Sequence, residues 1–544
     1  MKIRLFLFAM LVSVPAGMAS PQGSAAPIDP AALSRHVRML ASDAFEGRGP
    51  GTEGERRTIR YLAEQFRAAG AAPGGENGGW TQAVPMNRYT IQGMPAVRFE
   101  GARENCGFAP GEGMILWSRN PAGRVAIAGA PLVFAGHGVV APEADWDDYG
   151  AMDLTGKVVV LLSNDPDHGA ESGPFGGRAM SYYGRFSTKA EEAARRGALA
   201  VILVHDPAAS DSSWDVYRAA YSAPANGLAD GADSRIGFGS WLGLDPARRL
   251  FACAGLDLAE QQAAARRRGF RARDLPGVRL SAAFDVRVET TVTHNVIAIL
   301  RGRARPGETF VYTAHWDHMG RGRPDATGDA IYNGALDNAG GVAGLIELAR
   351  AFAAGPRPER SILFIATTLE ESGLLGAEYY ASHPLYPLET TVGGINMDAV
   401  NLFGPTGTME VTGMGKTELE DYLRAELEAA GRRMQDDPNS VVGFYYRSDH
   451  FPFARRGVPF LFAGSGWELA AERAPNRREP QVGTRFHQPS DEWEESLDFA
   501  AAARDMRLYH RIGLRLANAR DWPGWRTGAE FRALRLRSEA ARRR

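Results

Sequence analysis

The chain has 544 residues, of which 44% are hydrophobic and 23% charged, and its formal net charge is −2. A single hydrophobic core rarely serves a chain of this length, so two or more domains are expected. The near-neutral charge gives no basis for a nucleic-acid or anionic-membrane partner, and the apolar content excludes a disordered chain.

The N-terminus has the pattern of a secretory signal peptide. Lys2 and Arg4 precede the apolar run Leu5–Val14, and small residues follow. We expect residues 1–19 to be removed and the mature protein to be periplasmic or extracellular. A retained anchor is disfavoured because small polar residues follow the run at once. The sequence shows no later run of about 18 apolar residues, so no stable membrane insertion is expected.

Two helices are predicted within residues 28–118, the first part of the main domain. Leu33, Val37 and Leu40 form an apolar stripe on the first helix, and the second is expected from Thr52 to Ala69. They are joined by FEGRGPGTEGE, a glycine-rich connection that by itself could cap any globular fold.

Residues 119–277 have the texture of a separate β-rich domain inserted into the main one. Short β-branched runs (PLVFAGHGVV, GKVVVLLSND and LAVILVHD) accompany one helical stretch, KAEEAARRGA. The length of the segment is usual for a domain. His137, His168 and His205 lie here without a convincing set of carboxylate partners, so we interpret them as ordinary histidines.

The two cysteines, Cys106 and Cys253, are far apart in the sequence. Both a disulfide and two separate thiols are compatible with an exported protein. Neither cysteine lies in a CxxC motif or near a histidine cluster, so we expect a structural or free role and no catalytic one.

Strands and helices alternate across residues 278–524, which predicts an α/β domain whose mostly parallel central sheet is flanked by helices. In such sheets functional residues gather at the carboxyl ends of the strands. His315, Glu370, Glu371 and Asp398 each end or follow an apolar run. We therefore expect the chemistry at this edge of the sheet.

The C-terminal residues 525–544 form an Arg-rich, helix-prone tail. A polyanion contact is one interpretation of such a tail. We prefer a solvated terminal helix or a frayed end, because chain termini are commonly poorly tied down.

The histidines and carboxylates of the main domain have the composition of a zinc site. Zinc is bound by imidazole nitrogen and carboxylate oxygen, and a carboxylate can bridge two zinc ions. Asp337 suits the bridge because it joins a glycine-rich turn to a helix, and Asp317 suits a carboxylate that orients His315. Adjacent side chains at a strand end point in different directions, so one glutamate of the EE pair can bind metal while the other holds water. The candidate ligands are His315, Asp337, Glu371, Asp398 and His487, with Glu370 left over and His318 and His450 as neighbours.

Other catalytic classes lack their motifs in this sequence. There is no HExxH of a single-zinc helical protease, and the GSG at Gly464–Gly466 lacks the flanking context of a serine-hydrolase elbow. GALDNAGG lacks the GK[ST] of a phosphate-binding loop, so nucleotide binding is also disfavoured.

Six motifs together resemble metallopeptidase family 28, the co-catalytic zinc aminopeptidases: AHWDH, NGALDNAGG, LEES, NMDAV, YRSDHF and FHQPSDEW. The resemblance covers Val278–Leu516 and the N-terminal helices with their connection. It implies the zinc-exopeptidase α/β fold. The segment AGHGVVAPEADWDDYGAMDLTGKVVVLL resembles the protease-associated domain that this family often carries.

The resemblance implies two zinc ions per chain and a place for each ligand. His315 and Asp398 would bind one zinc, Glu371 and His487 would bind the other, and Asp337 would bridge them. The peptide bond between Asp337 and Asn338 would be cis, as it is in the family.

The same resemblance implies the catalytic groups. Glu370 would be the general base that takes a proton from the water between the metals, and Asp317 would orient His315. Tyr445 would stabilise the oxyanion, and a shift of one position in the alignment would give this role to Tyr446.

The function implied is an exported aminopeptidase acting on peptides with a free N-terminus. One alternative is another amide-processing enzyme of the same fold, either glutaminyl cyclase-like with one zinc or carboxypeptidase-like. A receptor-like binding protein on a peptidase scaffold ranks lower, because such relatives lose ligands and this chain keeps all five. Substrate preference would depend on loops such as Gly464–Gln481, with Trp467 and Glu468 as candidate contacts and Ala470–Gly483 as a lid or a plain surface loop.

Overall fold

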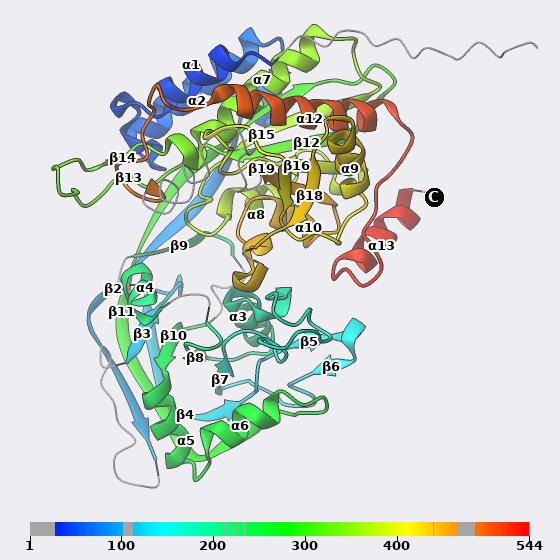
Figure 1. Cartoon of the computed structure of the whole chain (residues 1–544). Helices are drawn as coiled ribbons and strands as arrows, with labels where there is room; N and C mark the ends of the chain where they lie inside the picture. The colour runs from blue at the N-terminus through cyan, green and yellow to red at the C-terminus, as the bar shows by residue number, and fades with distance from the viewer. Residues whose placement is uncertain are drawn as a thin grey trace, which may run out of the picture.

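The computed structural model of the chain describes residues 28–101, 113–210, 213–221, 224–231, 236–438, 440–465 and 485–542. The predicted signal peptide, Cys106 and the segment with Trp467 and Glu468 lie outside these ranges. Figure 1 shows an upper and a lower lobe joined by the long strands β2 (Thr81–Glu100) and β11 (Arg273–Leu300). None of the helices in the described ranges is both long enough and apolar enough to cross a membrane.

One continuous sheet runs through both lobes, and β11 is its spine. The C-terminal part of β11 pairs with β15 (Arg360–Thr367) of the upper lobe, and its N-terminal part pairs with β4 (Arg124–Phe134) of the lower lobe. β2 lies antiparallel to β11 along most of its length. The strand order is β18 (Arg433–Asp436), β17 (Thr408–Val411), β19 (Phe460–Ser465), β16 (Thr391–Asn396), β12 (Arg305–His315), β15, β11, β4, β7 (Val158–Leu162), β8 (Ala200–His205), β10 (Phe238–Gly243) and β3 (Met114–Trp117).

The centre of the upper-lobe sheet is parallel. β12 pairs in parallel with β15 and with β16, and β16 pairs in parallel with β19. Every residue of β15 and β16 is buried, as expected for parallel strands covered on both faces. The edges are antiparallel, where β11 meets β15 and β17 meets β19. The predicted α/β class, with a large central sheet flanked by helices, is confirmed.

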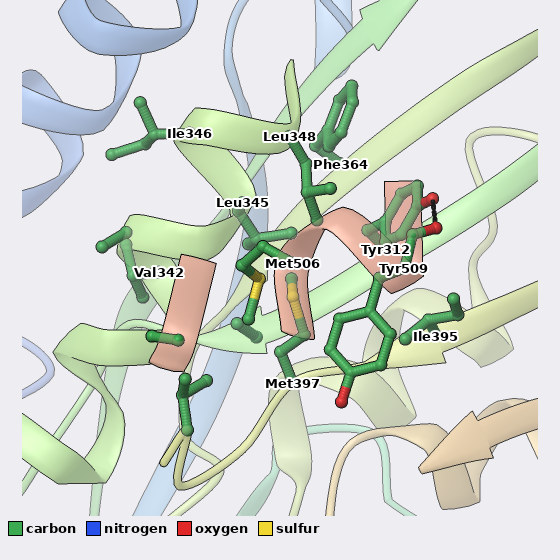
Figure 2. Packing of buried hydrophobic residues seen from close by; sticks show 14 of the residues in the cluster. Tyr312, Val342, Leu345, Ile346, Leu348, Phe364, Ile395, Met397, Met506 and Tyr509 are labelled. Atoms are coloured by element: carbon green, nitrogen blue, oxygen red, sulfur yellow. Dashed lines mark hydrogen bonds between the residues drawn. The ribbon is translucent and has the colours of Figure 1, made fainter. Parts of the chain in front are cut away.

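Helices cover both faces of this part of the sheet. Tyr312 of β12 points into the cluster on one face, and its neighbour Val311 points into the cluster on the other, because successive strand side chains alternate. Figure 2 shows Tyr312 and Phe364 of the first cluster near Leu348. The first cluster receives α1 (Pro30–Leu40), α2 (Glu53–Ala68), α7 (Gly340–Ala354), α9 (Leu419–Ala429) and α12 (Phe499–Asn518), and the second receives α8 (Leu375–Ser382) and α10 (His450–Ala454).

The two N-terminal helices form as predicted. The carboxylate of Asp29 caps α1 by accepting a hydrogen bond from the Ala31 N–H at 3.0 Å. Leu33, Val37 and Leu40 are buried on one side of the helix. Each such side chain contributes about 1.5–3 kcal/mol of burial free energy, so this apolar stripe is what holds α1 on the upper lobe.

The lower lobe is a smaller α/β unit of its own. β4, β7, β8 and β10 are parallel to one another, and β3 adds an antiparallel edge. The core includes Tyr89, Val97 and Phe99 of β2. The lobe is therefore larger than the predicted span 119–277, because β2 and β3 complete its core and its sheet. Its helices are α3 (Phe186–Arg195), α4 (Trp214–Tyr221), α5 (Leu244–Cys253) and α6 (Leu258–Ala265).

Several short strands lie outside the main path of the sheet. β9 leaves the lower lobe and pairs with β2. β13 and β14 form a small hairpin in the segment between the predicted ligands His315 and Asp337. The short strands are β1 (Ala72–Pro73), β5 (Val140–Ala141), β6 (Trp146–Asp147), β9 (Ala225–Leu228), β13 (Gly320–Arg321) and β14 (Ile331–Tyr332).

The C-terminal tail differs from the preferred sequence interpretation. Its helix, α13 (Arg532–Arg542), is docked on the upper lobe and is not a frayed end. Arg535 is 1% exposed and donates hydrogen bonds to the carbonyls of Thr391, Val392 and Pro523. These buried contacts hold the helix in place, because an unpaired buried guanidinium would be strongly unfavourable.

Candidate metal centre

The carboxyl ends of three neighbouring strands bring the candidate ligands together. His315 is the last residue of β12, Glu371 follows β15, and Asp398 follows β16. The parallel register sets His315 opposite Thr367 and Thr313 opposite Asn396, so the three strands end at one edge. Asp337 arrives from the helical turn that precedes α7, and His487 from the segment before α12. This is the edge at which the sequence predicts the chemistry.

Asp337 is shared between two groups of donor atoms. Its Oδ1 lies 3.2 Å from His315 Nε2, which is also 3.1 Å from Asp398 Oδ1. Its Oδ2 lies 3.1 Å from His487 Nε2, which is also 3.1 Å from Glu371 Oε2. Ligands about 2.0–2.2 Å from a tetrahedral zinc lie roughly 3.3–3.5 Å from one another, so the spacing is close to that of a zinc shell. All five predicted ligands meet here, and the donor set fits two zinc ions.

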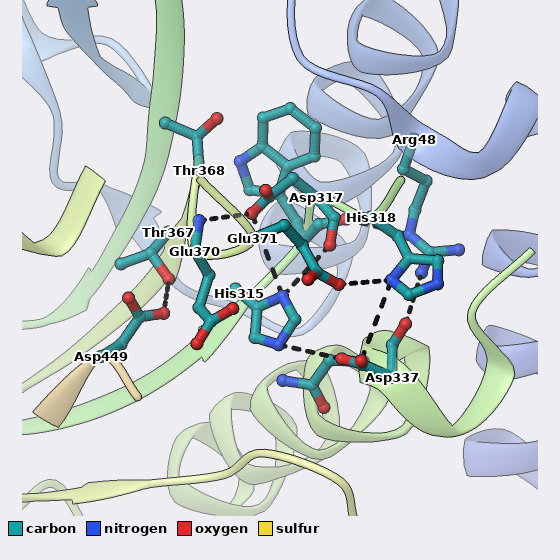
Figure 3. Close-up of polar contacts among 12 residues, drawn as sticks. Arg48, His315, Asp317, His318, Asp337, Thr367, Thr368, Glu370, Glu371 and Asp449 are labelled. Carbon is teal, nitrogen blue, oxygen red and sulfur yellow. Dashed lines mark hydrogen bonds and ion pairs between the residues drawn. The ribbon is translucent and has the colours of Figure 1, made fainter. Parts of the chain in front are cut away.

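His318 competes with His487 for the second group. Its Nδ1 is 2.6 Å from Glu371 Oε1 but 4.0 Å from Asp337 Oδ2. His318, Asp337 and Glu371 are close enough to hold a metal by themselves. We favour His487 as the ligand because its Nε2 lies at shell spacing from both carboxylates, whereas His318 reaches only Glu371. In that arrangement His318 hydrogen-bonds the other oxygen of Glu371 (Figure 3).

The imidazoles determine the charge state of the carboxylates in the chain without metal. Burial alone would raise the pKa of Asp337, but hydrogen bonds with His315 and His487 outweigh it and hold this pKa well below its usual value. Burial would lower the pKa of His487, but Asp337 and Glu371 raise it to about 10. Protonated imidazoles therefore occupy the charge positions that metal ions would take.

Glu370 differs from the other carboxylates of the cluster. Burial raises its pKa well above the usual value, and Asp398 and Glu371 add to this effect while His315 opposes it. Figure 3 shows its carboxylate near the ring of His315. A carboxyl group with a raised pKa beside a metal site is suited to accept and return a proton.

Asp317 contacts His315 through a different atom from the one predicted. His315 Nδ1 is 3.1 Å from the main-chain carbonyl of Asp317 and 3.9 Å from its carboxylate. The carboxylate instead accepts the N–H of Glu370 at 3.1 Å. Asp317 therefore orients the ring through its backbone and the base through its side chain.

Sequence reasoning missed three residues that position the ligands. Ser448 donates to Asp398 Oδ2 at 2.6 Å, which leaves Oδ1 for His315. Asp491, which is fully buried, accepts the N–H of Asp337 at 3.1 Å. Arg48 donates to main-chain carbonyls on both sides of the site. All three residues lie inside motifs already singled out in the sequence, YRSDHF, FHQPSDEW and FEGRGPGTEGE. Because a buried polar residue needs a hydrogen-bond partner, their place in these motifs could have indicated a role at the site.

The geometry separates the two tyrosines that compete for the oxyanion role. Tyr446 donates its hydroxyl to Glu530 at 2.5 Å and is thereby engaged in the core. The Tyr445 hydroxyl is buried and has no hydrogen-bond partner among the described residues.

The ring of His450 packs at 4.7 Å from that of Tyr445, so His450 is not a ligand of the cluster. The peptide bond between Asp337 and Asn338 is cis, as the resemblance implied.

In this fold, a carboxylate shared by two donor groups lies at the edge of a parallel sheet, and such a donor set fits a two-metal centre. Residues 295–510 match the model of peptidase family M28. This region includes all five predicted metal ligands and Glu370.

Several known proteins are similar to this chain. A probable zinc metalloprotease of Pyrenophora tritici-repentis is 28% identical over 229 residues, which are 40% of this chain and 50% of that protein. Another, of Leptosphaeria maculans, is 32% identical over 198 residues, which are 31% of this chain and 44% of that protein. The chain thus spans about half the length of these curated relatives. A solved aminopeptidase from Aneurinibacillus sp. strain AM-1 has a TM-score of 0.51 at 18% identity, over 91% of this chain and 96% of that one, which shows a shared fold.

Proposed function

We propose that the protein is a two-zinc aminopeptidase that removes the N-terminal residue of peptides. The observation that carries this proposal is the position of Asp337, whose two oxygens each face a different histidine and a different second carboxylate. A carboxylate placed in this way is the usual bridge between two catalytic metal ions. Membership of the M28 family supports peptide-bond hydrolysis.

In the proposed mechanism the chain supplies the base and the framework. Zinc, when bound, would polarise the scissile carbonyl and make water acidic at neutral pH. Glu370 takes the proton of the attacking water and returns it to the leaving amine. Asp317 holds the backbone of Glu370 and the ring of His315, so the base keeps a fixed distance from the ligands. The free hydroxyl of Tyr445 is available to stabilise the oxyanion.

The test is Glu370→Ala, assayed with aminoacyl substrates on protein of known zinc content. A general base typically contributes about 10²–10⁴-fold to the rate. We therefore expect kcat to fall by at least about 100-fold while both zinc ions remain bound. Glu378→Ala, on α8 and paired with Arg456, is the matched control and should keep the activity. Undiminished hydrolysis by Glu370→Ala would remove the proposed base and the mechanism with it.

The metal count also separates the proposal from its nearest alternative. An aminopeptidase of this design needs both donor groups filled, whereas a glutaminyl cyclase-like enzyme would hold one zinc. Two equivalents of zinc with release of N-terminal residues support the proposal. One equivalent with cyclisation of N-terminal glutamine would replace it.

We also propose that the protein is exported and that the lower lobe is a protease-associated domain. The signal-peptide pattern before residue 20 supports export. Cys253 is disulfide-bonded, which favours an oxidising compartment. N-terminal sequencing of the mature protein checks the export proposal, because cleavage near residue 19 is expected.

A further inference from the structure

The lower lobe contacts the segment Ser440–Arg447, which carries Tyr445. The N–H of Met180, in the lower lobe, donates to the carbonyl of Ser440 at 3.1 Å. Gly443 has φ +66°, and a Cβ built on it would lie 2.9 Å from the sulfur of Met180. The positive φ favours glycine at this position, and the absence of a Cβ lets Met180 pack against the backbone. These two contacts fix the backbone just before Tyr445.

Tyr182 extends the contact into the aromatic cluster that contains Tyr445. Its ring lies 6.5 Å from that of Tyr446, 6.0 Å from Phe451 and 5.6 Å from Phe531. Tyr445 packs in the same cluster, with its ring 5.2 Å from that of Tyr446. A side chain of the lower lobe thus forms one wall of the packing that surrounds Tyr445.

Charged groups hold the same interface. Glu191 of α3 receives two hydrogen bonds from Arg455, at 3.2 and 3.0 Å. The guanidinium carbon of Arg185 lies 4.7 Å from the centre of the Phe451 ring. A paired, two-point contact between guanidinium and carboxylate fixes orientation as well as distance. The interface is therefore built for one relative position of the two lobes.

A second part of the lower lobe reaches the glutamate pair. The side-chain amide of Asn226 in β9 donates to Ser372 Oγ at 3.0 Å, and Ser372 directly follows Glu371. Leu228, from the same strand, packs with Leu369 and Leu375 on either side of the pair. Both segments that carry predicted catalytic groups, Tyr445 and Glu370, are thus touched by the lower lobe.

We propose that the lower lobe is a positioning element for catalysis and that Tyr182 is the residue through which it positions Tyr445. This inference rests on the proposed peptidase function. None of the contacts described above involves a predicted metal ligand. The lower lobe therefore fixes the positions of the catalytic groups, whereas the upper lobe alone builds the metal site. Loss of the Tyr182 ring should let the Ser440–Arg447 segment relax and should leave zinc binding intact.

The test compares Tyr182→Leu with Tyr217→Leu. Tyr217 is also an aromatic residue of the lower lobe, but it packs on His205 and Trp241 within that lobe. Misplacing a catalytic group by about 1 Å can cost on the order of 100-fold in rate, so we expect kcat of Tyr182→Leu to fall by about 10–100-fold with KM and zinc content little changed. Tyr217→Leu should keep kcat. Tyr182→Phe should also keep the wild-type kcat, because the contacts described for Tyr182 at this interface are made by its ring.

A double variant shows whether the effect passes through Tyr445. If it does, Tyr182→Leu added to Tyr445→Phe lowers kcat no further than Tyr445→Phe alone. Multiplicative losses, or an undiminished kcat in Tyr182→Leu, would overturn the proposal. Hydrogen exchange of residues 440–447 is read in parallel and should be faster in Tyr182→Leu than in Tyr217→Leu. Exchange needs no activity. If the zinc-loaded wild-type protein hydrolyses no peptide while exchange is still faster in Tyr182→Leu, the peptidase function is contradicted and the packing role is not.

Discussion

Arg48 is a buried cation that joins separate parts of the chain at the metal site. Its guanidinium donates to the carbonyls of Leu40, Trp316, Asn333 and Gly334 at 2.6–2.9 Å. Burial lowers the pKa of Arg48 to about 10, so it stays charged at neutral pH. The residue therefore connects the end of β12 to the turn that presents Asp337.

Replacing this arginine should destabilise the fold markedly. Arg48→Met would leave the carbonyls of Leu40, Trp316 and Asn333 without this donor, whereas that of Gly334 keeps the N–H of Ala339. Each buried unsatisfied group costs about 1–3 kcal/mol. We expect a loss of at least about 3 kcal/mol in the free energy of unfolding, with a smaller loss for Arg48→Lys. Urea unfolding measures it. Arg56→Met, at an exposed ion pair on α2, is the control and should change stability by less than about 0.5 kcal/mol. Equal effects of the two methionine variants would contradict the role of Arg48.

The choice between His487 and His318 as a ligand can be decided by metal content. If His487 is the ligand, His487→Ala binds one zinc after dialysis against a weak chelator. His318→Ala should still bind two, with an affinity lower by about 10–100-fold, because it removes only a hydrogen bond to a ligating carboxylate. The reverse pattern, one zinc in His318→Ala and two in His487→Ala, would exchange the two assignments.

Among the elements, the packing of α12 on β12 leaves no room for a side chain at one position. The hydroxyl of Tyr312 in β12 donates to the carbonyl of Tyr509 in α12 at 2.7 Å, as the dashed line in Figure 2 shows. A Cβ built on Gly513 would lie 1.9 Å from that hydroxyl oxygen. The glycine is thus what lets the helix approach the strand that ends in His315.

Gly513→Ala is expected to destabilise the protein by about 3 kcal/mol, because the added methyl group overpacks a full core. Urea unfolding of the variant measures the change. Tyr312→Phe removes the atom in conflict, so the double variant should lose clearly less stability than the sum of the two single variants. Additive losses would show that the two residues do not meet as described.

At the scale of the whole molecule, metal binding should be linked to pH. His487 has a pKa raised to about 10 in the chain without metal, so it is protonated at neutral pH and must release that proton to bind zinc. The pKa of His315 is also raised. Apparent zinc affinity should therefore rise by about tenfold per pH unit for each proton released, up to about pH 10. Calorimetry in two buffers of different ionisation enthalpy measures the proton count, and a count of zero would contradict the assigned ligands.

Stability of the metal-free protein should change in the opposite direction. A histidine whose pKa is raised from 6.5 to about 10 stabilises the folded state fully below pH 6.5, and this contribution is lost as the pH rises toward 10. The difference in melting temperature between zinc-loaded and metal-free protein should therefore widen across this window.

Much of the upper lobe could be predicted from the sequence because its signals are local. Apolar runs that end in His315, Glu370 and Asp398 predicted both the parallel strands and the edge where the site lies. The position of the lower lobe's boundary could not be predicted in this way. β3 and the outer part of β2 lie before residue 119 in the sequence, and only long-range pairing with β10 and β11 assigns them to that lobe.

The amino-acid sequence by itself determined the class of fold, the list of candidate ligands and the resemblance to the M28 family, because periodicity and motif spacing are properties of neighbouring residues. Only the tertiary structure decided which atoms meet. Asp317 acts on His315 through its carbonyl, Tyr446 is engaged by Glu530, and Arg48 reaches the site from the N-terminal helices. Such contacts depend on how distant elements pack, and a buried polar atom takes whichever partner that packing brings within hydrogen-bonding distance.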